Sequence, residues 1–148
     1  MTTRFTCRKA TAADADAIAA VFSPSFRLLT FLPMLHTVEE DRGFFADVVL
    51  RQCEVTVAET AGRIVSFLAR VGEEIRLLHT HPDFIGAGAG RRLLDGAKTS
   101  SAVLELWCFQ ANTDARRFYE RHGFRAIRFT DGRDNEEKMP DVRYRWER

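Results

Sequence analysis

The sequence predicts an α/β fold in which a central mixed sheet is flanked by helices, in the order β-α-α-β-β-β-α-β-α-β-β. Three observations lead to this prediction. Two capping-box sequences near the N-terminus predict helices. Alternating apolar residues within 54–80 predict antiparallel strands. Beyond residue 80, apolar strands alternate with helical patterns, which favours parallel or crossover connections.

Size and composition restrict the function classes. The chain has 148 residues, so we expect one domain over residues 1–148. Its 22 basic and 21 acidic residues give a net charge of +1, which argues against nucleic acid as a partner. No apolar run is long enough for a membrane span, and no secretory signal is recognisable. Three cysteines without a CxxC pair favour reduced thiols, no metal site and a cytoplasmic location.

The first elements follow from local signals. Residues 4–10 alternate loosely and predict a strand. Thr11 and Asp14 resemble a capping box, with Asp in place of Glu, that opens a helix. Pro24 is expected to stop that helix.

An apolar segment at 26–36 follows and is interrupted by Pro33. It either forms a wall or lid over a substrate pocket or packs into the core, and its apolar residues are Phe26, Leu28, Phe31, Leu32, Met34 and Leu35. Thr37 and Glu40 form a second capping box, which predicts a helix to about Leu50.

From residue 54, apolar and polar residues alternate with the period of two that is typical of strands. The remaining elements, in order, are expected to be strands at 54–58, 63–69 and 74–80, a helix at 91–99, a strand at 103–109, a helix capped by Asn112 and ended by Gly123, and strands at 124–130 and 142–146. We expect the last strand to lie at a sheet edge, where it could support a homodimer; a monomer is the alternative.

A glycine-rich loop between the strand at 74–80 and the next helix predicts an anion site. Three glycines alternate with alanines over 86–90, so a ligand could approach the backbone closely. Backbone N–H groups at a helix N-terminus bind phosphates, and Arg91 and Arg92 follow directly. A tight structural turn is the alternative. The spacing fits neither a P-loop nor a dinucleotide-binding loop, since Gly90 is not followed by Lys-Ser or Lys-Thr and no GxGxxG is present.

Two motifs carry a family resemblance that covers about residues 4–147. Residues 80–94, THPDFIGAGAGRRLL, resemble the acetyl-CoA loop of GNAT-family N-acetyltransferases. Residues 112–124, NTDARRFYERHGF, resemble the second signature of that family, N-x-x-A-x-x-F-Y-x-x-x-G-F. One departure is Ile85, which stands where the family usually has Gln or Arg.

The resemblance implies acetyl-CoA as cosubstrate, with no metal. The cofactor-binding positions that it implies are Leu78, His79, Thr80, Ile85, Gly86, Ala87, Gly88, Ala89, Gly90, Arg91 and Asn112. The backbone at 78–80 would pair with pantetheine or polarise the thioester carbonyl, and the loop would hold the pyrophosphate. Ordinary sheet pairing at 78–80 and a simple helix cap at Asn112 are the alternatives.

The resemblance also implies the catalytic groups. Tyr119 would be the general acid that protonates the leaving thiolate. Glu74 would be the general base, because histone-acetylating members of the family have a glutamate at the matching place. A polar turn is the alternative reading of Glu74, and His79 and His36 are further base candidates, although both are more simply structural.

The function expected is an acyl-CoA-dependent N-acetyltransferase that acts by direct transfer in a ternary complex. Its acceptor would be a small-molecule or peptide amine. A non-catalytic CoA-binding or regulatory module of the same fold is the alternative, and an unrelated phosphate-ligand domain is a third hypothesis.

Overall fold

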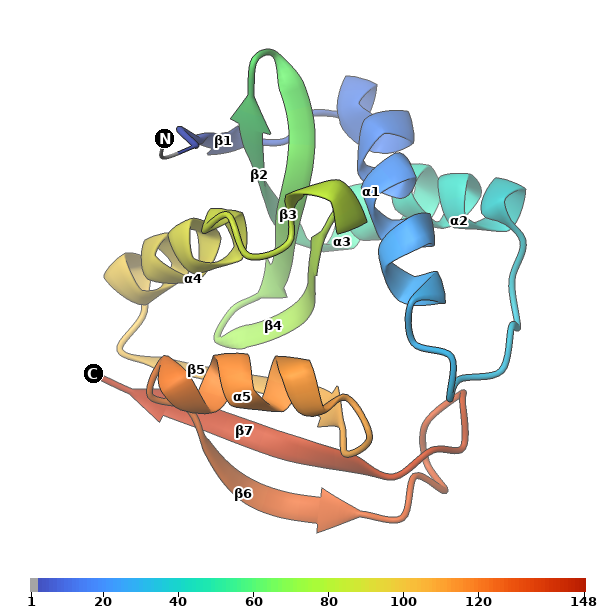
Figure 1. The fold of residues 1–148 in the computed structure, drawn as a ribbon, viewed down its shortest axis with the longest axis vertical. Coiled ribbons are helices and arrows are strands. Elements are labelled where there is room, and N and C mark those ends of the chain that lie inside the picture. The colour runs from blue at the N-terminus through green and yellow to red at the C-terminus, as the bar shows by residue number, and fades with distance from the viewer. Residues whose placement is uncertain (1–2) are drawn as a thin grey trace.

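The computed structural model describes residues 3–148 and contains one seven-stranded sheet (Figure 1). Its elements are β1 (Thr6–Lys9), η1 (Ala12–Asp14), α1 (Ala15–Arg27), α2 (Val38–Phe44), η2 (Phe45–Val49), α3 (Leu50–Gln52), β2 (Glu54–Thr60), β3 (Arg63–Val71), β4 (Glu74–Thr80), η3 (Pro82–Phe84), α4 (Ala89–Ser100), β5 (Val103–Phe109), α5 (Thr113–Arg121), β6 (Arg125–Thr130) and β7 (Asp141–Glu147). The predicted fold class and element order are therefore confirmed.

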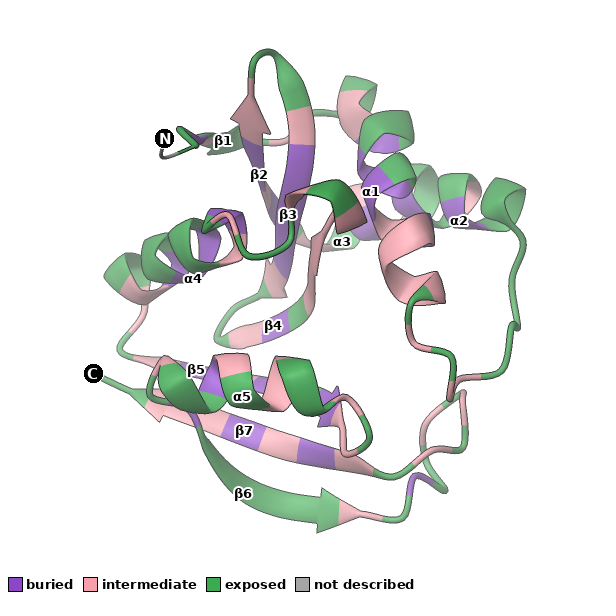
Figure 2. Ribbon diagram, in the orientation of Figure 1, coloured by how far each residue is buried: buried purple, intermediate pink, exposed green. Residues whose placement is uncertain are grey.

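The strand order is β1-β2-β3-β4-β5-β7-β6. All neighbouring strands are antiparallel except β4 and β5, which are parallel and are joined through α4. The last strand, β7, lies between β5 and β6, so the expectation that it would be an edge strand was wrong. The interior position suits β7 because its Val142 and Tyr144 side chains are fully buried in the core. The edge position suits β6 because five of its six residues are exposed (Figure 2).

Helices cover both faces of the sheet and divide the core in two. On one face, α4 and α5 bury Leu93, Leu94 and Tyr119 against β4, β5 and β7. On the other, α1 and η2 bury Ile18 and Phe45 against β2 and β3. Apolar residues spaced three or four apart on each helix produce these buried faces.

The capping boxes form as expected. The Asp14 carboxylate accepts a hydrogen bond from the Thr11 backbone N–H at 2.8 Å. Thr37 and Glu40 exchange two hydrogen bonds, each of 3.1 Å. The second box opens a helical run that continues through a π-helical turn, η2, to Gln52.

The expectation that Pro24 stops the first helix was wrong, since α1 continues to Arg27. Proline removes one hydrogen bond of the helix, a cost that tertiary contacts can offset. Here the Phe22 and Phe26 rings stack at 5.2 Å across the proline, and the buried Ser23 hydroxyl donates to Asp41 of α2 at 2.6 Å. The last turn of α1 is therefore held against α2.

Candidate functional site

The strands β4 and β5 separate soon after they pair. Their register contains only Glu74 with Glu105 and Ile75 with Leu106, although each strand has seven residues. From Leu77 to Thr80, β4 pairs with β3 on one edge and with no described residue of β5 on the other. This opening exposes strand-edge hydrogen-bonding groups to an extended ligand.

A β-bulge lies where the strands begin to part. Ile75 pairs with Arg70 and Leu77 pairs with Ala69, so Arg76 is an extra residue in β4. Ile75 belongs to the core under α4, whereas Leu77 packs in the core under α1. In a regular strand residues two apart share a face, so the bulge changes the direction of the backbone at the opening.

A cavity of about 770 Å³ occupies the opening and continues to the segment between α1 and α2. It is lined by Leu77, Leu78 and His79 of β4, Trp107 and Cys108 of β5, Asn112 and Tyr119 at α5, and Phe26, Met34 and Leu35 from the region of α1 and the following loop. The apolar segment at 26–36 thus contributes to the cavity wall through three of its six named residues. One cavity therefore connects the open strand edge with the segment that follows α1.

Tyr119 is one of the residues that line this cavity. It is 8% exposed, and none of residues 3–148 forms a hydrogen bond with its hydroxyl. Burial raises the pKa of Tyr119 well above its ordinary value, so the phenol keeps its proton at neutral pH. By contrast, the Tyr144 hydroxyl accepts from Arg116 at 3.0 Å and donates to Glu120 at 2.5 Å.

The side chain of His79 points to the α1 side of the sheet. Its ring stacks on Phe67 and meets the edge of Phe22, with centroid distances of 5.9 and 4.9 Å. Its Nδ1 lies 3.0 Å from the Ser25 hydroxyl. Burial lowers the pKa of His79 to about 4, so the ring is neutral at physiological pH.

The glycine loop has the geometry of an anion-binding turn. Gly86 and Gly88 adopt left-handed conformations with φ of 82° and 100°, and no heavy atom lies within 4 Å of a Cβ built on either. The first hydrogen bond of α4 runs from Arg92 N–H to Gly88 O, so the N–H groups of residues 88–91 are available to a ligand, whereas the Ala87 N–H donates to Phe84 O at 3.4 Å. A Cβ built on Gly90 would lie 3.6 Å from the Phe118 ring, an ordinary van der Waals distance.

The other predicted cofactor positions lie on β4, in the glycine loop, in α4 and at the N-terminus of α5. Thr80 ends β4, and its hydroxyl lies 2.9 Å from that of the buried Ser66. Ile85 is 61% exposed and Arg91 is exposed beside Asp95. The Asn112 side chain caps α5 by accepting from Ala115 N–H at 3.3 Å, and it also lines the cavity.

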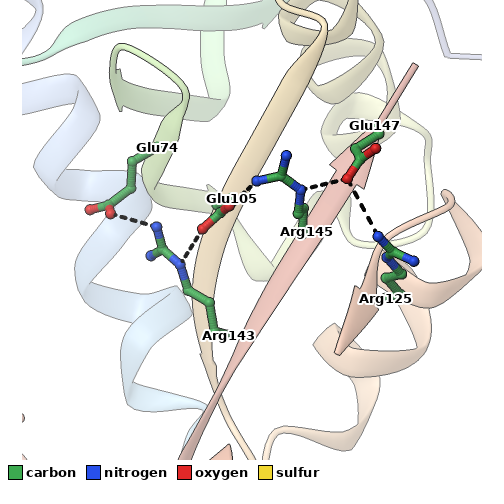
Figure 3. Close-up of polar contacts among 6 residues, drawn as sticks. All are labelled: Glu74, Glu105, Arg125, Arg143, Arg145 and Glu147. Carbon is green, nitrogen blue, oxygen red and sulfur yellow. Dashed lines mark hydrogen bonds and ion pairs between the residues drawn. The ribbon is translucent and has the colours of Figure 1, made fainter. Parts of the chain in front are cut away.

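Glu74 lies in a network of ion pairs (Figure 3). Its carboxylate contacts Arg76 Nε at 2.7 Å and an Arg143 guanidinium nitrogen at 3.0 Å. Glu74 is not among the residues that line the cavity, whereas its neighbours Ile75 and Arg76 are. Its role as general base stays a prediction.

Sequence reasoning missed one wall of the cavity. Glu40, Gly43, Phe44, Asp47 and Val48 line it from the helical run that begins at Val38. Their spacing of three and four residues marks one helical face, which could have revealed them. Glu136 and Glu137 also line the cavity, from the polar loop between β6 and β7.

Residues 51–126 match the family model described as the acetyltransferase (GNAT) domain. The chain belongs to the GNAT acetyltransferase family. The match covers the open strand edge of β4, the glycine loop and the helix that carries Tyr119.

Solved structures share the GNAT fold at low sequence identity. A GCN5-related N-acetyltransferase from Rhodopseudomonas palustris has a TM-score of 0.81 and 22% identity, with 100% of this chain and 97% of that one covered. The PaiA N-acetyltransferase of Thermoplasma acidophilum, in complex with coenzyme A, has a TM-score of 0.74 and 15% identity, with 98% and 99% covered. YncA of Salmonella typhimurium, with acetyl-CoA, has a TM-score of 0.69 and 18% identity, with 97% and 93% covered. No curated protein sequence matches the chain significantly.

Two further findings concern residues 3–148 of this GNAT protein. No helix within them has the length and apolar character needed to cross a bilayer. Their His, Cys, Asp and Glu side chains do not gather in groups of three suited to a metal ion.

Proposed function

We propose that this GNAT protein transfers the acetyl group of acetyl-CoA directly to a primary amine in a ternary complex. The observation that carries this proposal is that one cavity is lined both by the open edge of β4 and by Tyr119, whose hydroxyl has no hydrogen-bond partner among residues 3–148; the cavity continues to the segment between α1 and α2. The similar Thermoplasma and Salmonella structures, which contain coenzyme A and acetyl-CoA, support it.

The chain's own residues fit such a cosubstrate. An extended pantetheine with two amides can pair with a strand edge, here the backbone of Leu78, His79 and Thr80. The left-handed Gly86 and Gly88 leave room for a pyrophosphate at the N-terminus of α4. Exposed Ile85 offers no polar contact, so backbone N–H groups would supply most of the binding.

The chemistry requires a proton donor beside the leaving group. Bound acetyl-CoA supplies an acetyl carbon to which the amine nitrogen bonds while the carbon–sulfur bond breaks and the sulfur takes the electron pair. Tyr119 would donate its proton to that sulfur and regain one from solvent, because burial disfavours a lasting phenolate. A backbone N–H of β4 near the bulge would polarise the carbonyl.

The ammonium group of the acceptor must also lose two protons, one to a base before the nitrogen attacks and one to solvent as the amide forms. Glu74 is the base implied by the family resemblance, but two guanidinium groups contact its carboxylate. Glu137 is a carboxylate that lines the cavity itself, and burial raises its pKa above the usual value. A raised pKa suits a general base, so substitutions at both positions are needed to assign the role.

A CoA-binding module without turnover is the second candidate, and Ile85 is the observation that favours it. One experiment with two measurements distinguishes the two functions. Calorimetry measures CoA binding, and mass spectrometry detects acetylated products after a broad panel of amines is incubated with the protein and acetyl-CoA. Acetylated product that forms in proportion to protein supports the transferase. Tight CoA binding without any acetylated amine would establish the module instead.

A further inference from the structure

Large apolar side chains remain exposed around the cavity end formed by α2 and the segment before it. Met34 is 69% exposed, Leu35 44% and Phe44 43%, and all three line the cavity. Trp107, 44% exposed, lines it from β5. Exposed apolar residues grouped around a cavity are typical of a ligand-binding surface. The ligand body that suits this end is therefore apolar, and Phe44 and Trp107 offer aromatic contacts.

The same cavity is rich in carboxylates. Those that line it belong to Glu40, Asp41, Asp47, Glu136 and Glu137. Three of them have partners within the chain. Asp41 accepts from the Ser23 hydroxyl at 2.6 Å, and Glu40 and Glu136 lie 3.5 and 2.7 Å from the two ring nitrogens of His36.

The other two carboxylates are available to a ligand. Asp47 and Glu137 form no ion pair with any residue of the range 3–148. Glu137 is half-buried, and burial raises its pKa because the charged form lacks solvation. A cationic ligand would supply the missing counter-charge.

The arginines of the cavity have partners already. Arg27 lies 3.4 Å from the Asp41 carboxylate and donates to the backbone oxygens of Ser23 and His36. Arg76 lies 2.7 Å from Glu74. A ligand carboxylate would therefore enter a cavity with five carboxylates and two engaged guanidinium groups.

We propose that the acceptor is a primary amine attached to an aromatic, apolar body that carries no carboxylate, that is, an arylalkylamine. This inference rests on the proposed function and specifies its acceptor. The aromatic body contacts the apolar walls, and the carboxylates attract the ammonium group. A free amino acid is disfavoured because its carboxylate finds no available guanidinium, and a polyamine leaves the apolar walls without contacts.

Matched amines test the proposal. We expect kcat/KM for 2-phenylethylamine to exceed that for phenylalanine by at least about tenfold, since the two differ by one carboxylate in a negatively charged cavity. Phenylalaninamide, which is equally bulky but uncharged at that position, should recover most of the loss. A preference for phenylalanine or for spermidine would overturn the proposal while leaving amine acetylation intact.

A matched pair of variants tests the carboxylate. Glu137→Gln should raise KM for 2-phenylethylamine by about threefold or more and leave the Kd of CoA unchanged. Asp134→Asn, on the same loop but outside this cavity, should change neither. Equal effects of the two substitutions would contradict the proposed role of Glu137.

A binding measurement separates the acceptor class from catalysis. In the presence of CoA, calorimetry should detect 2-phenylethylamine binding and no phenylalanine binding. If this amine binds but no amine in the panel is acetylated, the proposed function fails and the ligand class stands. If it neither binds nor reacts, the inference is wrong.

Discussion

Glu74 and Glu105 face each other as register partners where β4 and β5 begin to part. Two carboxylates directly opposite each other repel. Arg143 of β7 lies between them, with a guanidinium nitrogen 3.0 Å from Glu74 and Nε 3.0 Å from Glu105 (Figure 3). The paired end of the two strands is thus held together by one shared cation, and the cavity begins just beyond it.

Loss of the shared cation should destabilise the fold. Arg143→Met leaves the two facing carboxylates without their common partner. We expect the free energy of unfolding to fall by about 1–3 kcal/mol, between the values of exposed and buried pairs. Urea denaturation measures it. Arg125→Met, which removes the exposed end of the same network, should have a much smaller effect; equal losses would refute the assignment.

Substitution of Glu74 tests its two roles separately. Glu74→Gln keeps the shape but removes the charge that Arg76 and Arg143 contact. Because these ion pairs assign the Glu74 carboxylate to the structure, we expect the variant to have a lower melting temperature. We expect its kcat to stay within about threefold of wild type. Loss of a general base typically costs at least about 100-fold in rate. A loss of that size at unchanged stability would assign the base to Glu74.

The glycine loop predicts a specific effect on CoA binding. Gly88→Val adds a side chain at a φ of 100°, where the open space would admit a phosphate. We expect the Kd of CoA to rise by at least about tenfold, from backbone strain and obstruction together. Gly96→Ala, in the interior of α4, is the control and should leave the Kd unchanged while slightly stabilising the helix. Similar Kd values for the two variants would show that the loop does not bind the ligand.

The His79 ring, enclosed by Phe22 and Phe67, predicts how stability depends on pH. Its pKa is about 4 in the folded protein and about 6.5 when unfolded, so the unfolded chain binds the proton more tightly. Stability is therefore lost as the pH falls from about 6.5 toward 4. Between pH 7.5 and 5, the wild type should lose about 2 kcal/mol more than His79→Phe, as measured by urea denaturation. Parallel losses would indicate that His79 titrates normally.

Local signals predicted most of the elements. The capping boxes of Thr11 and Thr37 depend on residues three positions away and formed as expected. The same holds for Asn112 as a helix cap. These features need no knowledge of the rest of the chain.

Features that depend on distant partners could not be predicted. The continuation of α1 past Pro24 rests on contacts with α2, and the bulge at Arg76 appears only when β3 supplies the register. The contact between Arg143 and Glu74 follows from the insertion of β7 beside β5. A one-dimensional pattern contains none of these relationships.

The most direct test compares two tyrosines that differ in the hydrogen bonds of their hydroxyl groups. Tyr119→Phe removes a hydroxyl that has no hydrogen-bond partner among residues 3–148, from a side chain that lines the cavity. Tyr144→Phe removes a hydroxyl that is hydrogen-bonded to Arg116 and Glu120. The measurement is the rate of thiol release from saturating acetyl-CoA with the best amine. We predict that Tyr119→Phe lowers kcat by at least about 100-fold without weakening CoA binding. Tyr144→Phe should cost about 1–3 kcal/mol of stability and leave kcat nearly unchanged. A Tyr119→Phe variant as fast as wild type would contradict the central claim.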